Sequence, residues 1–188
     1  MFYTKMNGKN QLLRVKGKKV FLRYVVVDDF EEMQVLFQES RKFYKGLIDT
    51  PSDIERFRAY VARNESETNE CLVICRIADG KIVGSINLSQ IFRKGFQNAY
   101  LGYSLGVKYI GNGFMTEAVQ LILRFAFKDL KLHRIEANVQ PENLPSIAVL
   151  KRCGFTKEGF SRKYLKIGGK WRDHERFAII REDWNIKK

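Results

Sequence analysis

The spacing of hydrophobic residues changes abruptly at Gly113, and this change constrains the fold more than any other feature of the sequence. Before Gly113, three β-prone stretches alternate with turn signals, at residues 70–77, 82–91 and 97–107. After it, apolar residues recur at helical spacing: Met115, Ala118, Val119, Ile122, Phe125 and Ala126. A helix with so wide an apolar stripe must pack on the sheet that precedes it, which indicates a mixed α/β (α+β) fold.

The remaining elements extend this layout. We expect a strand at residues 19–24, a helix over residues 30–37, and a second helix that starts at Ser52, because Ser52 and Glu55 form a capping-box pattern. Later segments predict a strand at Arg134–Val139, a helix from Asn143 to Arg152 ended by Gly154, and a hairpin of Phe160–Ile167 and Trp171–Ile180. The order is β-α-α-β-β-β-α-β-α-β-β, without repeats or linkers, so residues 1–188 are expected to form a single domain.

Composition limits the classes of function. The formal net charge of +13 favours anionic partners such as nucleic acid, phosphorylated cofactors or an acidic membrane surface. No apolar run reaches the roughly 18 residues of a membrane span, and the basic N-terminal segment lacks the apolar core of a secretory signal, so we expect a cytoplasmic protein with no membrane partner. Three cysteines, an odd number, favour reduced thiols, and the two distant histidines give no reason to expect a metal site.

A glycine-bearing loop, residues 109–118, leads into the long helix. Gly111 and Gly113 allow a sharp turn with backbone N–H groups directed inward, and the helix N-terminus adds partial positive charge. This pattern predicts a phosphate-binding cradle, although a tight strand-to-helix turn without a ligand explains an isolated pair of glycines equally simply. It matches neither the Walker loop nor the dinucleotide fingerprint.

Several segments resemble one known family. They are Leu101-Gly102-Tyr103-Ser104-Leu105, residues 111–118, residues 132–139, residues 143–155, Lys157-Glu158-Gly159 and residues 169–174. In this order and spacing they resemble the GNAT superfamily of acetyl-CoA-dependent N-acetyltransferases, and within it the RimJ/RimL type of ribosomal-protein alanine N-acetyltransferase. The resemblance implies a GNAT-like acyl-CoA N-acyltransferase fold, with a central, mostly antiparallel sheet flanked by helices.

The resemblance also implies a cofactor site. Main-chain N–H groups of the loop would hold the pyrophosphate of acetyl-CoA, through Gly111, Asn112, Gly113, Phe114, Met115 and Thr116. The strand edge would bind the pantetheine arm at Leu105, Gly106 and Val107, with charge from Lys108, and Asn143 and Ser146 would also contact the cofactor. The sequence departs from the family at Ile110, where Arg or Gln is usual, and at Met115, where Gly or Ala is usual.

For catalysis, the resemblance makes Ser146 the acid that protonates the departing thiolate, and Tyr103 is a possible proton carrier. Asn143 is equally well explained as a helix cap that accepts from the N–H of Ser146. Where some members of the family place a carboxylate base, this chain has Tyr100 and Leu165, which leaves the base unassigned.

Further carboxylates in the matching segments include Glu117, Glu158 and Asp173. Of these, Glu117 is explained more simply as a partner of the helix dipole. Cys153 is expected to be a buried structural residue rather than a nucleophile.

We therefore expect a transferase that moves an acetyl group from acetyl-CoA to a primary amine by direct attack on the thioester. The favoured acceptor is the N-terminal alanine or serine amine of a protein such as a ribosomal protein, with possible ribosome association and a monomeric or homodimeric state. Polyamine or aminoglycoside acetylation is an alternative. A second is a non-catalytic RNA- or ribosome-binding module, to which the basic clusters at residues 16–19, 41–45 and 162–166 would be suited.

Overall fold

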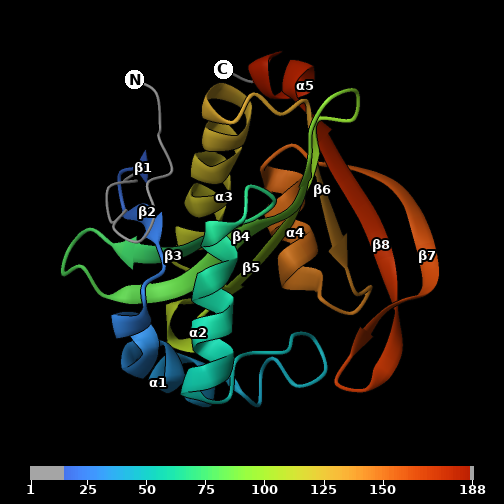
Figure 1. Cartoon of the computed structure of the whole chain (residues 1–188). Helices are drawn as coiled ribbons and strands as arrows, with labels where there is room; N and C mark the ends of the chain where they lie inside the picture. The colour runs from blue at the N-terminus through green and yellow to red at the C-terminus, as the bar shows by residue number, and fades with distance from the viewer. Residues whose placement is uncertain (1–14, 187–188) are drawn as a thin grey trace.

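The structure, a computed structural model, describes residues 15–186. Eight strands in this range form one sheet in the order β1-β2-β3-β4-β5-β6-β8-β7 (Figure 1). Every neighbouring pair is antiparallel except β5 and β6, which are parallel. The predicted mixed, mostly antiparallel sheet is thereby confirmed. Residues 1–14, which make up most of the basic segment used to judge a secretory signal, lie outside the described residues.

The bounds of the elements follow the chain. The strands are β1 (Val15–Lys16), β2 (Val20–Tyr24), β3 (Glu70–Arg76), β4 (Ile82–Phe92), β5 (Asn98–Leu105), β6 (Arg134–Val139), β7 (Thr156–Ile167) and β8 (Lys170–Ile180). The α-helices are α1 (Phe30–Ser40), α2 (Ile54–Ala62), α3 (Phe114–Arg124), α4 (Leu144–Arg152) and α5 (Arg181–Ile186). A 3₁₀ turn, Val107–Tyr109, leads from β5 toward α3, and a π-helical turn, Phe125–Asp129, continues α3.

Some predicted boundaries were wrong. The cap of α2 is Asp53 rather than Ser52: the Asp53 carboxylate accepts from the Arg56 N–H at 2.9 Å, and the Ser52 hydroxyl donates to that carboxylate instead. A carboxylate is the stronger acceptor, so it takes the cap position. Strand β7 begins at Thr156, four residues before the predicted start at Phe160, and β1 and α5 were not predicted.

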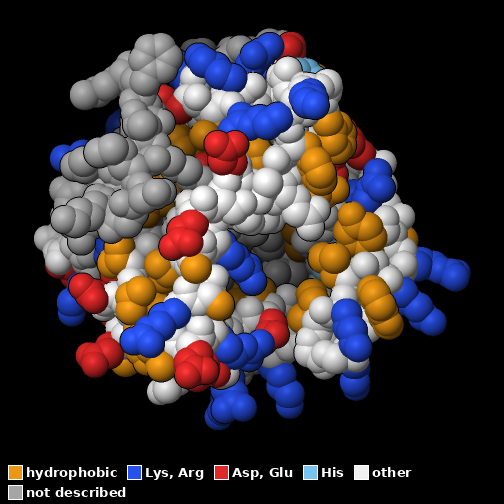
Figure 2. Space-filling model, in the orientation of Figure 1, with side chains coloured by type: hydrophobic (Ala, Val, Ile, Leu, Met, Phe, Trp, Pro, Cys, Tyr) orange, Lys and Arg blue, Asp and Glu red, His pale blue; other side chains and the backbone are white. Residues whose placement is uncertain are grey.

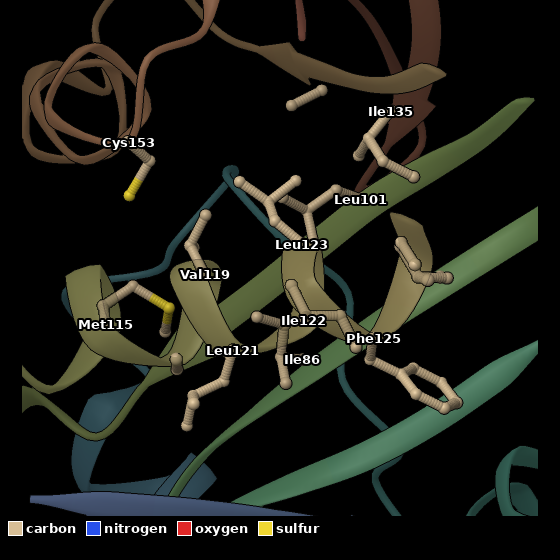
Figure 3. Close-up of a cluster of buried hydrophobic side chains, with 14 of the residues drawn as sticks. Ile86, Leu101, Met115, Val119, Leu121, Ile122, Leu123, Phe125, Ile135 and Cys153 are labelled. Carbon is tan, nitrogen blue, oxygen red and sulfur yellow. The ribbon is translucent and has the colours of Figure 1, made fainter. Parts of the chain in front are cut away.

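Hydrophobic side chains on the two faces of the sheet form two separate cores. Helices α3 and α4 cover one face and pack on residues such as Ile86, Leu101 and Ile135 (Figure 3). Helices α1 and α2 cover the other face over β3 and β4, with Phe57 fully buried (Figure 1). As the wide apolar stripe predicts, α3 is buried over much of its circumference.

The sheet opens at its centre. Strand β5 pairs with β6 only through Asn98–Tyr100 and Arg134–Glu136, although β5 continues to Leu105 and β6 to Val139. Beyond these three pairs the two strands separate, and α3 makes the crossover between them.

Two further properties of residues 15–186 bear on function. None of the helices there has both the length and the apolar composition needed to cross a membrane. No three His, Cys, Asp or Glu side chains in this range are grouped so that they could hold a metal ion.

Candidate active site

The glycine loop has the backbone conformation that the sequence predicts. Gly111 and Gly113 have φ angles of +85° and +77°, in the left-handed region that favours glycine. Gly113 is the N-cap of α3, and because it has no side chain, no cap hydrogen bond covers the first N–H groups of the helix. These N–H groups and the positive end of the helix dipole form a site suited to phosphate oxygens.

This loop borders a cavity of about 710 Å³, here called the α3–α4 cavity. Nine of the residues predicted to be catalytic or to bind the cofactor line it: Tyr103, Leu105, Gly111, Gly113, Phe114, Met115, Thr116, Asn143 and Ser146. They come from the end of β5, the start of α3 and the start of α4. The fold thus brings together segments that are up to 43 positions apart, as with Tyr103 and Ser146.

Four other predicted cofactor residues do not line this cavity: Gly106, Val107, Lys108 and Asn112. The Nζ of Lys108 forms an ion pair with Glu39 at 2.8 Å, so its charge is directed toward α1 rather than toward the loop. The side chain of Asn112 donates to the carbonyls of Tyr109 and Ile110, at 3.1 and 3.3 Å, and braces the loop from within.

The strand edge at Leu105 is already hydrogen-bonded. The Tyr44 hydroxyl donates to the Leu105 carbonyl at 2.7 Å and accepts from the Leu105 N–H at 3.0 Å. The N–H of Val107 donates to the Ser40 hydroxyl at 3.0 Å. A pantetheine arm that uses the Leu105 N–H must therefore displace Tyr44.

Two lysines of the basic cluster at residues 16–19, which were not predicted as cofactor residues, supply positive charge at the cavity. Lys18 and Lys19 both line it, and the Nζ of Lys19 donates to the Asn112 carbonyl at 3.0 Å. Glu117 on α3 holds them there, because its carboxylate accepts from the backbone N–H groups of Lys18, Lys19 and Val20 at 2.5, 2.9 and 3.2 Å. No local sequence signal links residues almost 100 positions apart.

Two hydroxyl groups meet in the wall of the cavity. The Tyr103 hydroxyl lies 2.8 Å from the Ser146 Oγ and donates to the Ser146 carbonyl at 3.2 Å. Burial raises the pKa of Tyr103 above its usual value, so the phenol keeps its proton at neutral and mildly alkaline pH. The pair forms a two-hydroxyl chain that can deliver a proton into the cavity.

Asn143 caps α4 and also lines the cavity. Its side-chain oxygen accepts from the Ser146 N–H at 3.3 Å, as the cap interpretation predicts. Because the oxygen serves the helix, the amide N–H₂ is the part of the side chain that a ligand can use. The cap also fixes the first turn of α4 and with it the position of Ser146.

Comparison with known proteins decides the family. The acetyltransferase (GNAT) domain model matches residues 19–156 of this chain. The chain belongs to the GNAT acetyltransferase family. Together with the relatives and the CoA complex described next, this confirms the predicted fold class, the N-acetyltransferase activity and acetyl-CoA as the cosubstrate.

Relatives of this GNAT enzyme match either nearly its whole length or about half of it. It is 40% identical over 177 residues to a probable N-acetyltransferase, YjcK, of Bacillus subtilis, with 90% of this chain and 98% of the relative covered. It is 43% identical over 104 residues, 55% of this chain and 54% of the relative, to the [ribosomal protein uS5]-alanine N-acetyltransferase of Escherichia coli. A structure of Mycobacterium smegmatis RimJ in complex with CoA-disulfide superposes with a TM-score of 0.81 at 29% identity, covering 87% of this chain and 82% of that one.

Two of the carboxylates considered as the general base of this GNAT enzyme bond other residues of the protein. Glu158 forms a bidentate ion pair with Arg134, which lowers the pKa of Glu158 and makes it a poor proton acceptor. Asp173 accepts from the backbone N–H of Lys163 at 2.7 Å and belongs to the terminal hairpin. Neither lines the α3–α4 cavity.

Cys153 is buried, as the sequence predicts. Its Sγ lies 3.5 Å from the Thr116 carbonyl, and burial raises the pKa of the thiol to about 12. A thiol with this pKa is protonated at neutral pH, so Cys153 packs between α3 and α4 and does not act as a nucleophile.

Proposed function

We propose that this acetyltransferase acts on the N-terminal amine of a protein, that the acceptor begins with alanine or serine, and that it is a ribosomal protein. Similarity to the E. coli enzyme named for alanine of ribosomal protein uS5 supports this acceptor class. A ribosomal acceptor implies action in the cytoplasm.

The observation that carries the chemistry is the hydroxyl pair of Tyr103 and Ser146, 2.8 Å apart in the wall of the α3–α4 cavity. In the proposed reaction, the neutral amine forms a bond to the thioester carbonyl carbon and the C–S bond breaks. Ser146 donates its proton to the departing thiolate and takes the proton of Tyr103 in its place. The surplus proton of the amine passes to water, and water returns a proton to Tyr103, so both hydroxyls end the cycle protonated.

Backbone N–H groups and lysine side chains of the protein would hold the negatively charged cosubstrate. The N–H groups at the start of α3 would face the pyrophosphate. Lys18 and Lys19 line the same cavity and add the positive charge that Ile110, which stands where the family usually has Arg or Gln, does not supply. This arrangement supports retention of acetyl-CoA binding despite the departure at Ile110.

The β7–β8 hairpin supports association with the ribosome. Phe160, Leu165 and Trp171 are 52, 42 and 60% exposed, and basic side chains lie between them along the two strands. Figure 2 shows hydrophobic and basic side chains side by side along this edge of the molecule. Exposed aromatic and basic groups together favour contact with RNA bases and phosphates.

The experiment mixes the protein with acetyl-CoA and one acceptor at a time: peptides with free N-termini that start with Ala, Ser or Met, a polyamine and an aminoglycoside. Release of CoA and the product masses identify the acceptor. Acetylation of the α-amine of the Ala or Ser peptides supports the proposal. Acetylation of only the small amines contradicts it.

A further inference from the structure

A second cavity, here called the α1–α2 cavity, lies on the opposite face of the sheet from the α3–α4 cavity. It measures about 380 Å³ and is bounded by α2, the loop that precedes it, and the outer face of β4 and β5. The two cavities share Ile48 and Tyr103, at the place where β5 and β6 separate. Figure 2 shows the molecule hollowed on this face, with basic side chains near the hollow.

The shared residue Tyr103 connects this cavity to the chemistry. Its hydroxyl is bonded to Ser146 on the α3–α4 side. A thioester that reaches Ser146 from one face therefore lies next to an opening to the other face. An amine that enters through the α1–α2 cavity can approach the carbonyl without crossing the bound cosubstrate.

The lining of the α1–α2 cavity is polar and carries a positive balance. Arg56 and Arg63 from the α2 region line it, and Asp49 is the only acidic residue among its lining residues. Asp49 is paired with Arg56 at 3.5 Å, but both side chains are mostly exposed, so this pair is weak. Arg63 has no ion-pair partner among residues 15–186.

The floor of the cavity also offers groups suited to a peptide. The Oδ1 of Asn87 accepts from the Tyr60 hydroxyl at 2.7 Å and from the Leu72 N–H at 3.3 Å. These bonds fix the side chain and leave its amide N–H₂ for a ligand. A peptide carbonyl is a natural acceptor for this group.

The two arginines are spaced for an extended peptide. They are seven residues apart, so they lie on one face of the helical segment about 10 Å apart along its axis. An extended chain covers that length in about three residues. A carboxylate at one of the first few positions after the N-terminal residue can thus reach one arginine or the other.

We propose that the α1–α2 cavity receives the acceptor, and that Arg56 and Arg63 select protein N-termini that carry an aspartate or glutamate within the first few residues. The proposal deepens the proposed function and rests on it. It also gives a physical reason against a polyamine acceptor, because a polycation would enter a cavity with two arginines and one aspartate.

The test compares pairs of peptides that begin with the same residue and differ only in an acidic residue or its amide at positions two to four. We expect kcat/KM to be about tenfold higher for the acidic member, which corresponds to one charge-assisted hydrogen bond. The double variant Arg56→Gln with Arg63→Gln should lose this preference, so that the ratio of kcat/KM between the acidic peptide and its amide partner falls to about one. Arg58→Gln is the matched control, since Arg58 is exposed on the same helix and does not line the cavity.

The outcomes separate the two proposals. Peptide acetylation without a preference for the acidic member, or with a preference that survives in the double variant, overturns the arginine selection alone. Acetylation of polyamines but of no peptide, or of none of the acceptors, overturns the protein-acceptor proposal and the selection with it. Loss of preference in Arg58→Gln as well as in the double variant attributes it to general surface charge and overturns the selection.

Discussion

The hydroxyl of Tyr44 bonds both backbone groups of Leu105, donating to the carbonyl at 2.7 Å and accepting from the N–H at 3.0 Å. Tyr44 lies in the loop between α1 and α2, whereas Leu105 ends β5 at the open edge of the sheet. One side chain thus takes the place that a neighbouring strand would take in a complete ladder. Any ligand that bonds the Leu105 N–H competes with it, because an N–H group makes one strong hydrogen bond.

Tyr44→Phe should therefore strengthen binding of acetyl-CoA. Removal of the hydroxyl frees the Leu105 N–H, and one neutral hydrogen bond of about 1 kcal/mol corresponds to roughly fivefold in Kd. Isothermal titration calorimetry measures the change, and thermal unfolding should show a lower Tm for the free variant. Tyr109→Phe serves as control, since Tyr109 does not line the α3–α4 cavity. An unchanged or weaker affinity in Tyr44→Phe contradicts the competition.

Ser146→Ala and Tyr103→Phe should each lower kcat with little effect on the KM for acetyl-CoA. The hydroxyl chain acts on the departing thiolate, and general acid catalysis contributes roughly 10² to 10⁴ in rate. Steady-state kinetics with a saturating acceptor measures the loss. Ser89→Ala, which changes a half-buried hydroxyl on β4, is the matched control. Wild-type kcat in both variants would remove the hydroxyl chain from the mechanism.

Gly113→Val should abolish detectable binding of acetyl-CoA. At a φ of +77° a β-branched residue is strained, and its side chain would stand where the phosphates approach the first N–H groups of α3. Gly80→Val is the control, because Gly80 has a similar φ of +73° in an open turn between β3 and β4. Both variants should lose stability, but only Gly113→Val should lose binding. Normal binding by Gly113→Val refutes the cradle.

Lys19→Gln should weaken acetyl-CoA binding by about tenfold at low salt, since it removes a charge beside the loop. The affinity of the variant should also depend less steeply on ionic strength, because fewer charges contact the ligand. Titrations at several salt concentrations test both effects. Lys16→Gln changes a nearby exposed lysine outside the cavity and should behave as wild type. Equal salt dependence in all three proteins contradicts a role for Lys19.

The three cysteines should resist alkylation in the folded protein and react on unfolding, because all are free and buried. Burial raises the pKa of Cys75 to about 11 and of Cys153 to about 12. A thiol in the unfolded chain loses its proton above about pH 8.5. Between that pH and the higher pKa of the folded protein, the unfolded state therefore binds fewer protons than the folded state. The free energy of unfolding falls as pH rises through this range. Denaturant titrations at about pH 7 and about pH 9.5 should show a smaller fall in Cys153→Ala than in wild type. An equal fall in both proteins contradicts this contribution.

Periodicity and turn residues predicted most of the helices and strands and their order along the chain. The stripe from Met115 to Ala126 predicted a helix buried in the core, and Asn143 was correctly considered as a cap of α4. Such features depend on residues close together in sequence, where spacing alone carries the information. The family resemblance added the mostly antiparallel character of the sheet and the nature of the cosubstrate.

The remainder of the site depends on contacts between distant segments. The three bonds from Lys18, Lys19 and Val20 to Glu117 follow from packing of β2 beside α3, which no local pattern encodes. The ion pair that directs Lys108 to Glu39 is of the same kind. The cap of α2 was predicted wrongly for a different reason: Ser52 and Asp53 are both good caps, and the capping-box pattern at Ser52 and Glu55 outweighed the stronger acceptor at Asp53.

The short ladder between β5 and β6 has a consequence for the catalytic cycle. Because only three residue pairs join them, the first five strands and the last three are hydrogen-bonded to each other at only one end of their boundary. A cosubstrate arm that bonds the Leu105 N–H would replace the hydroxyl of Tyr44 there. Release of the product would then return this N–H to Tyr44, so the bond between Tyr44 and Leu105 would break and form again once in every cycle.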